Sequence, residues 1–136
     1  MHKLINPKSV FNSLQYGFSQ AVLTNGSQQL FLSGQVATDE NQNTIATGMK
    51  DQTRVCLENI EKVLKEANSQ KEHVSMLRIY IKESANTPEA QNDIAEALQE
   101  FFVNCSPASS WVVVTGLALP EWLIEIEAQA VIPNSI

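Results

Sequence analysis

The chain has 136 residues, a formal net charge of −6 and a pI of about 4.8, and this length predicts one domain, residues 1–136, with a sizeable core. It holds only nine Lys and Arg residues and no basic run, so we expect no nucleic-acid partner, because phosphate binding depends on clustered positive charge. No apolar run approaches the roughly 20 residues that span a membrane, and residues 1–7 lack the apolar core of a signal peptide, which together predict a cytoplasmic protein that does not bind membranes.

A β-hairpin is the first predicted element. Residues 18–24 and 28–34 are strand-like and flank Asn25-Gly26, and Asn-Gly is the strongest short signal for a hairpin turn. A helix follows over residues 49–67, because its apolar residues recur every three to four positions. The residues of this apolar stripe are Cys56, Ile60, Val63, Leu64 and Ala67.

The next predicted elements are a strand and a second helix. Residues 74–81 form the strand, and alternation assigns its side chains to two faces. Ser75, Leu77, Ile79 and Ile81 share one face, and Val74, Met76, Arg78 and Tyr80 share the other. Thr87-Pro88 then provides an N-cap residue and a proline at the first helical position, and Pro107 prevents the helix from continuing. The apolar stripe of this helix is Ile94, Ala97, Leu98, Phe101 and Phe102.

Two more strands, residues 110–114 and 123–131, complete the predicted elements. In the last strand, Ile124, Ile126, Ala128 and Ala130 alternate with Glu125, Glu127 and Gln129. The order hairpin, helix, strand, helix, strand, strand predicts an α+β fold, with two helices on one face of a mixed sheet. The other face is half apolar, and we expect self-association to cover it.

The cysteines and histidines offer little support for metal or nucleophilic chemistry. Cys56 and Cys105 are far apart and have no nearby His, which predicts free thiols in a reducing compartment rather than a disulfide or a catalytic thiol. His2 and His73 are the only histidines, so neither a Cys/His zinc site nor a Ser-His-Asp triad is supported.

Five segments resemble, in order and spacing, the RidA (YjgF, endoribonuclease L-PSP) family. They are residues 18–21 (Phe-Ser-Gln-Ala), 33–35 (Ser-Gly-Gln), 52–60, 101–102 and 124–128 (Ile-Glu-Ile-Glu-Ala). The resemblance implies a chorismate-mutase-like fold, a homotrimer with a central barrel, and small-molecule clefts between subunits. It also implies hydrolysis of enamines and imines derived from amino acids, with release of ammonia and without a metal or organic cofactor.

The same resemblance assigns roles to residues and marks this chain as divergent. Glu125 matches the glutamate that orients the attacking water, and the Ser33-Gly34 segment matches the backbone of the pocket. Ser109 stands where Pro-Ala-Arg-Ser in other members places the arginine that holds the substrate carboxylate, and Phe18 replaces a tyrosine. The expected catalytic residue is therefore Glu125, and the expected substrate-binding residues are Phe18, Ser33, Gly34, Ser109 and Trp111.

Three residues near this region leave alternatives open. Arg78 either forms an ion pair with a glutamate at the trimer interface or holds the substrate carboxylate in place of the arginine that is missing at position 109. Trp111 and Trp122 either form an aromatic wall that favours an apolar or uncharged ligand or pack in the core or interface.

Two functions therefore remain. One is a divergent hydrolase or deaminase acting on an enamine, an imine or a related C–N bond, and weak on typical 2-imino acids. The other is a non-catalytic protein that binds a small molecule or regulates through the same cleft. A ribonuclease is disfavoured because the chain is acidic and lacks a His pair.

Overall fold

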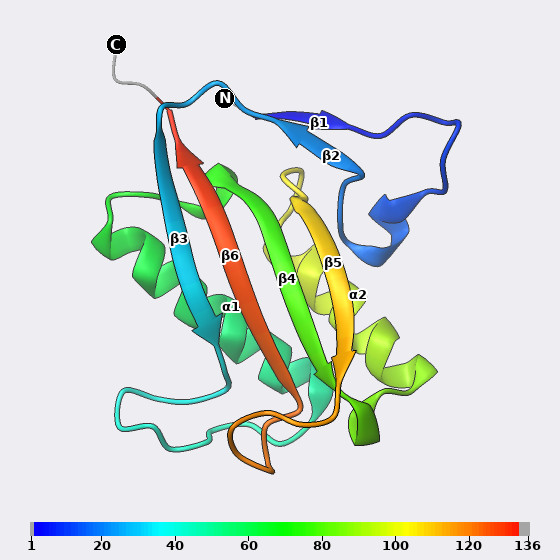
Figure 1. Ribbon diagram of the computed structural model, residues 1–136, viewed down its shortest axis with the longest axis vertical. Helices are drawn as coiled ribbons and strands as arrows, with labels where there is room; N and C mark the ends of the chain where they lie inside the picture. The colour runs from blue at the N-terminus through cyan, green and yellow to red at the C-terminus, as the bar shows by residue number, and fades with distance from the viewer. Residues whose placement is uncertain (1, 134–136) are drawn as a thin grey trace.

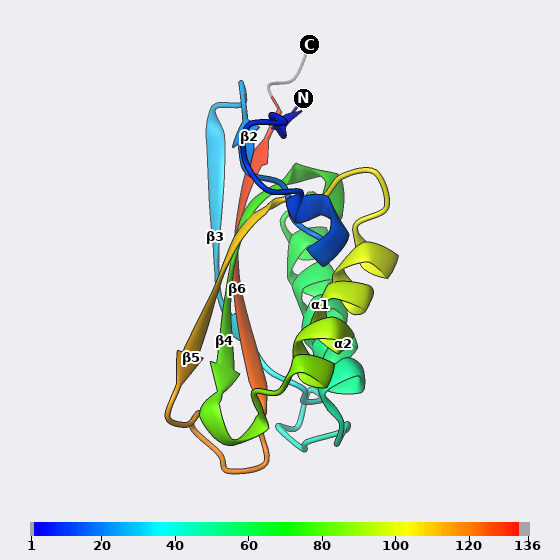
Figure 2. The same cartoon turned by 90° about the vertical axis from the view of Figure 1, so that its right-hand side faces the viewer.

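The computed structural model describes residues 2–133, in which a four-stranded sheet carries two helices on one face (Figures 1 and 2). The strands are β1 (Lys3–Ile5), β2 (Ala21–Leu23), β3 (Gln28–Gln35), β4 (Val74–Lys82), β5 (Ala108–Val114) and β6 (Ile124–Ile132). The helices are α1 (Met49–Glu66) and α2 (Pro88–Phe101), with short 3₁₀ turns at Ser13–Tyr16, Lys71–His73 and Glu83–Ala85.

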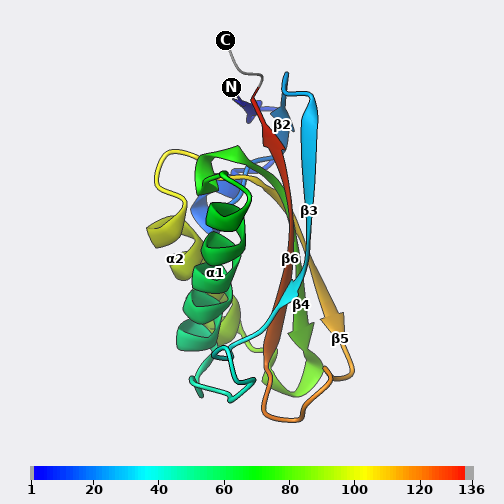
Figure 3. The same ribbon diagram turned by 90° about the vertical axis from the view of Figure 1, so that its left-hand side faces the viewer.

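The main sheet has the order β3-β6-β4-β5. β6 runs antiparallel to both β3 and β4, whereas β4 and β5 are parallel, so the sheet is mixed as predicted. Figure 3 shows α1 and α2 side by side on one face, with the opposite face open. The predicted α+β fold with two helices on one face is therefore confirmed. Within residues 2–133, no helix combines the length and the apolar character needed to cross a bilayer.

Helix α1 buries most, but not all, of its predicted stripe. Cys56, Ile60 and Leu64 are fully buried, and Leu57, which the prediction left out, is buried with them. The prediction was wrong for Val63, which is 39% exposed. At about 100° per residue, Val63 lies on the same margin of the stripe as the buried Gln52, so this margin is covered near the start of α1 and exposed at Val63.

Helix α2 begins as predicted. The Thr87 side chain accepts a hydrogen bond of 3.0 Å from the Ala90 amide, and Pro88 occupies the first turn. The predicted stripe faces the core, with Phe101 only half-buried. The helix ends at Phe101, before Pro107 as predicted, and Asn104, at φ +60°, turns the chain away.

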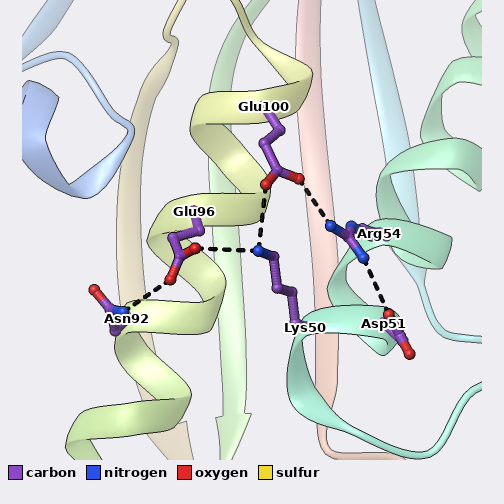
Figure 4. Close-up of polar contacts among 6 residues, drawn as sticks. All are labelled: Lys50, Asp51, Arg54, Asn92, Glu96 and Glu100. Carbon is purple, nitrogen blue, oxygen red and sulfur yellow. Dashed lines mark hydrogen bonds and ion pairs between the residues drawn. The ribbon is translucent and has the colours of Figure 1, made fainter.

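An ion-pair network joins the outer surfaces of the two helices (Figure 4). Lys50 Nζ lies 3.1 Å from Glu96 and 3.2 Å from Glu100, and Arg54 lies 3.1 Å from Glu100 and 3.2 Å from Asp51. Arg54, followed by Lys50, lowers the pKa of Glu100. Because these side chains are largely exposed, each pair contributes little to stability.

The predicted hairpin across Asn25-Gly26 is wrong. β2 pairs with β1, not with β3, and Figure 1 shows β1 and β2 beyond the β5 edge while β3 lies at the opposite edge. Ser19 accounts for this position, because its amide donates to Pro107 O (2.8 Å) and its hydroxyl to Ser106 O (2.6 Å). Long-range hydrogen bonds thus outweigh the local turn signal. Gly26 packs instead against the backbone of Ile132, where a side chain would overlap it.

The alternation of β4 is also wrong at one residue. Leu77, Ile79 and Ile81 face the helices as predicted, but Val74 is buried with them. The register between β4 and β6 shifts between Val74 and Met76, and such a bulge turns the preceding side chain to the other face. In β6 the predicted alternation holds, with Ile124, Ile126, Ala128 and Ala130 in the core.

Both cysteines are free thiols, as predicted. Burial raises the pKa of Cys56 to about 12. A thiol with such a pKa stays protonated at neutral pH and is a poor nucleophile.

Candidate functional site

A β-bulge brings Gly34 against Glu125. The register between β3 and β6 shifts between Leu32 and Gln35, so Ser33 and Gly34 leave the regular ladder. A Cβ atom at Gly34 would overlap the Glu125 carboxyl group, with Glu125 Cδ only 2.7 Å away. The absence of a side chain at position 34 therefore creates the space for this carboxylate. Ser33 is exposed beside it, and its carbonyl accepts a hydrogen bond from the Gln35 side chain.

Glu125 and Glu127 have different electrostatic surroundings. Glu125 is half-buried, and burial, followed by repulsion from Glu127, raises its pKa. Glu127 accepts a hydrogen bond of 2.5 Å from the Tyr80 hydroxyl, and this bond raises the pKa of Tyr80. Within residues 2–133 no side chain donates a hydrogen bond to the Glu125 carboxylate. Tyr80 thus takes up one oxygen of the Glu127 carboxylate, whereas both oxygens of Glu125 are without a side-chain donor in the described part of the chain.

Arg78 lies on the same open face of the sheet. It stands opposite Glu127 in β6 and Ser110 in β5. Its side chain is exposed, and in the described part of the protomer it forms no ion pair. The ion pair that the sequence predicts for Arg78 lies at a trimer interface, which one protomer does not contain.

A second group of predicted site residues gathers at the β5 edge. Trp111 Nε1 donates a hydrogen bond of 3.1 Å to Ser109 Oγ. The rings of Phe18 and Trp111 are 6.2 Å apart between centroids, in a tilted arrangement. Phe18, Ser109 and Trp111 thus form a contiguous group, in which Ser109 is hydrogen-bonded to the tryptophan.

The two groups lie on opposite faces of the sheet. In the β4–β5 register, Ser109 pairs with Leu77 and Trp111 with Ile79, and both partners are buried under the helices. Glu125 instead pairs with Tyr80 on the open face. Because paired residues share a face, one protomer does not bring Glu125 together with Ser109.

Gln52 and Trp122 hold the segment that leads into β6. Buried Gln52 donates to Ala46 O (3.0 Å) and Glu121 O (2.9 Å), and its carbonyl accepts from Leu123 N (2.9 Å). Trp122 is buried and donates to Thr44 Oγ1 (3.0 Å), so it packs rather than lining a ligand site. The sequence did contain a signal for Gln52, a polar residue four positions before Cys56 in the apolar stripe.

The Phe18 group continues into aromatic residues that no sequence motif indicated. Phe11 lies 6.3 Å from Phe18 and 6.4 Å from Tyr16 between ring centroids. A cavity of about 440 Å³ adjoins Phe11 and is lined by residues 6–8 and 10–14. Neither Glu125 nor Ser109 lines this cavity. Residues 6–16 carry no helical or strand periodicity, so no sequence pattern indicated the cluster.

No metal centre is evident in the part of the chain that the structure describes. Nowhere in residues 2–133 do three His, Cys, Asp or Glu side chains gather in a way that could hold a metal ion. His73 is engaged by its neighbours, since its Nδ1 lies 2.9 Å from Ser69 Oγ and its carbonyl oxygen 2.6 Å from the His2 ring.

Comparison with known proteins agrees with the fold. The family model described as Endoribonuclease L-PSP matches residues 12–132. A RutC family protein of Pyrococcus horikoshii is 36% identical over 117 residues, which cover 83% of this chain and 85% of the relative. A RutC family protein of Aquifex aeolicus is 30% identical over 115 residues, which cover 84% and 87%.

Solved structures show the same architecture. YyfB of Yersinia pestis, a protein of unknown function in the conserved Rid family, is 34% identical, with a TM-score of 0.90 over 96% of this chain and 98% of its own. A member of the YjgF family from Neisseria meningitidis is 30% identical, with a TM-score of 0.64 over 87% and 89% of the two chains. The resemblance noted in the sequence is thereby confirmed.

Proposed function

Because the chain belongs to the endoribonuclease L-PSP (RidA/YjgF) family, we propose that it is a divergent deaminase-type hydrolase of an enamine, an imine or a related C–N bond. The observation that carries this proposal is the Glu125 carboxylate. It is half-buried, has a raised pKa and lies over the Gly34 backbone. A carboxylate in such surroundings is a stronger base than an exposed one and suits the activation of water.

Glu125 takes the role of water-orienting base in this proposal. It accepts a proton as the water oxygen adds to the carbon of the protonated C=N bond, which gives a neutral carbinolamine. The Glu125 carboxyl group then returns this proton to the nitrogen and the C–N bond breaks. Ammonia leaves as the carbinolamine hydroxyl gives its proton to the Glu125 carboxylate and the carbonyl group forms. No cofactor is required, since water is the only co-reactant.

A homotrimer is part of the same proposal. Phe31 is 67% exposed and Val112 42% exposed, and together with Arg78 they lie on the sheet face that no helix covers. Packing three such faces around one axis would bury them. It would also allow Glu125 of one subunit to approach the Ser109 group of another, which one protomer does not achieve.

The absence of an arginine at position 109 limits the substrate range. A charged hydrogen bond to a carboxylate contributes about 1.5–3 kcal/mol, so its loss from the transition state lowers the rate by roughly 10- to 150-fold. We therefore infer weak activity on typical 2-imino acids. The acidic composition also argues against RNA as a substrate, although the family description names a ribonuclease.

A non-catalytic binding or regulatory protein is the second candidate function. It is favoured by the Trp111–Ser109 hydrogen bond and by Phe18, because these residues replace an anion clamp and a hydroxyl with neutral aromatic contacts. In this case the cleft would bind a small molecule without hydrolysing it.

Ammonia release from freshly generated 2-iminopropionate and 2-iminobutyrate tests the proposal. We expect slow turnover by the wild-type protein and none by Glu125→Gln, while Glu58→Gln, an exposed change on α1, behaves like wild type. Equal turnover by Glu125→Gln and wild type would contradict the role of Glu125.

A further inference from the structure

Three aromatic rings form a row beside Ser109. Phe11 and Phe18 meet edge to face at 6.3 Å, and Phe18 and Trp111 meet at 6.2 Å with a 53° tilt. Phe11 is 60% exposed at the outer end of the row, and Trp111 is hydrogen-bonded to Ser109 at the inner end. The row therefore connects position 109, where other family members have the arginine that holds the substrate carboxylate, to the surface through aromatic side chains.

A cavity opens at the outer end of this row. Its volume is about 440 Å³, and Phe11 forms part of its wall with residues 6–8, 10 and 12–14. Small-molecule sites in proteins range from about 300 to 1,000 Å³, so the cavity can accept a ring-sized group. The only ionisable side chain among its lining residues is that of Lys8, which is exposed.

The segment that forms the cavity is anchored at several points. Gln20 Nε2 donates to Phe11 O (2.9 Å), and Gln99 Nε2 donates to Gln15 O (2.8 Å) and to Leu14 O. Gly17, at φ +90°, packs so closely on α2 that a Cβ atom would lie 2.7 Å from Leu98 Cβ. The pocket is thus preformed, and a ligand would not need to order the segment as it binds.

No guanidinium is available to this row within the protomer. Arg54 is paired with Asp51 and Glu100 on the outer helix surface, and Arg78 lies on the opposite face of the sheet. Ser109 accepts a hydrogen bond from Trp111, which leaves its own proton available as a neutral donor. A ligand at this end of the row would therefore meet a neutral hydrogen-bond donor, the Ser109 hydroxyl, and no positive charge.

We propose that the row of Phe11, Phe18 and Trp111, with the cavity beside Phe11, selects a neutral C–N compound that carries an aromatic group. The ring of the ligand packs against Phe11 and Phe18, and the Ser109 hydroxyl donates to its neutral polar end. This inference rests on the proposed function for the identity of the site, and it names the substrate class that the site takes.

Binding of unreactive probes tests the selection separately from catalysis. Titration calorimetry on the full chain would compare phenylacetamide, which is neutral and aromatic, with phenylacetate, which carries a charge, and with propionamide, which lacks the ring. We expect phenylacetamide to bind on the order of 10-fold more tightly than either of the others, because only it combines ring packing with a neutral polar end.

Single substitutions test whether phenylacetamide binds at the aromatic row. Phe11→Ala should weaken phenylacetamide binding by about 3- to 10-fold through the loss of one aromatic contact, and it should still fold because Phe11 is exposed. Phe18→Leu should also weaken phenylacetamide binding, because it removes the ring while it keeps an apolar side chain. Val103→Ala, which removes exposed apolar surface outside the row, should leave the affinity unchanged.

The outcomes separate this inference from the proposed function. Phenylacetamide binding that is equal in Glu125→Gln and wild type, and weaker in Phe11→Ala by about 3- to 10-fold, would support the aromatic selection even if no imine were hydrolysed. Phenylacetate binding as tightly as phenylacetamide would overturn the neutral selection and direct attention to Lys8. Propionamide binding as tightly, or unchanged binding in Phe11→Ala, would overturn the role of the aromatic row.

Discussion

The Glu125 carboxylate occupies the space that a side chain at Gly34 would fill. The β-bulge at Ser33 and Gly34 creates this arrangement, since it removes both residues from the regular β3–β6 ladder. The position of the proposed base is therefore determined by a glycine on the neighbouring strand.

Gly34→Ala should lower activity more than stability. The methyl group meets only Glu125 side-chain atoms at the closest contacts, and these can rotate away, so we expect a loss of about 1 kcal/mol or less in the free energy of unfolding. The displaced carboxylate should lower the ammonia-release rate by about 10-fold or more. Gly116→Ala is the matched control, because a Cβ there meets nothing within 4 Å. Unchanged activity in Gly34→Ala would show that the carboxylate position does not matter.

The contribution of Glu125 to the free energy of unfolding should be more favourable at low pH than at neutral pH. Its pKa is raised in the folded state, mainly by burial, so between the ordinary and the raised pKa the folded state binds more protons than the unfolded state. Stability contributed by this group therefore falls as pH rises through the raised pKa. Glu125→Gln should be more stable than wild type at pH about 7.5, by less than about 1 kcal/mol after screening.

Urea denaturation of both proteins measures this difference. The stability gap should shrink towards zero at about pH 4, below the ordinary pKa of glutamate. A gap that widened as pH fell would mean that the pKa of Glu125 is lowered rather than raised.

Gln52 should be important for stability although it does not contact the proposed substrate. Gln52→Ala leaves the carbonyls of Ala46 and Glu121 and the amide of Leu123 without their partner. Each of these three groups costs about 1–3 kcal/mol when it is left without a partner, so we expect a total loss of at least about 3 kcal/mol by thermal or urea denaturation. Gln91→Ala, which removes an exposed side-chain hydrogen bond, should change stability by less than about 0.5 kcal/mol.

The elements that could be predicted from sequence are those with local causes. Thr87-Pro88 caps α2 through a bond to Ala90, three residues away, and the alternation of β6 follows from one continuous buried face. The Asn25-Gly26 hairpin could not be predicted correctly, because the contacts of Ser19 with Ser106 and Pro107 determine where β2 lies.

In the candidate site, too, the sequence indicated individual residues but not the long-range contacts that place them. The family match selected Glu125 and Gly34, which the structure brings together, and also Ser109 and Trp111, which it places on the other face. No spacing along the chain reveals that separation, because it depends on the register between β4 and its two neighbours. Phe11 was not selected because its contact with Phe18 depends on the fold of an irregular segment.

The protein should be a trimer in solution. Light scattering at micromolar concentration should give three times the chain mass of 15.1 kDa, because the open sheet face exposes Phe31 and Val112. Val112→Asp should shift the assembly towards monomers, since a buried unpaired charge is costly at an interface. Val103→Asp, an equally charged change at an exposed site outside that face, should remain trimeric. A stable wild-type monomer would contradict the proposed inter-subunit cleft.

Ser109→Arg should restore activity on small 2-imino acids. The change would return a guanidinium to the position where the family holds the substrate carboxylate, and a charged hydrogen bond there corresponds to roughly a 10- to 150-fold increase in kcat/KM. It also removes the acceptor of the Trp111 hydrogen bond, so thermal denaturation of the variant should accompany the rate measurement. Adding Phe18→Tyr should raise the rate further by returning a hydroxyl group.

Ser109→Gln, which is long but uncharged, is the control and should give no increase on 2-iminopropionate. Robust turnover of 2-iminopropionate by the wild-type protein would show that Ser109 does not remove the clamp function, and Arg78 would then be the first residue to test as its substitute.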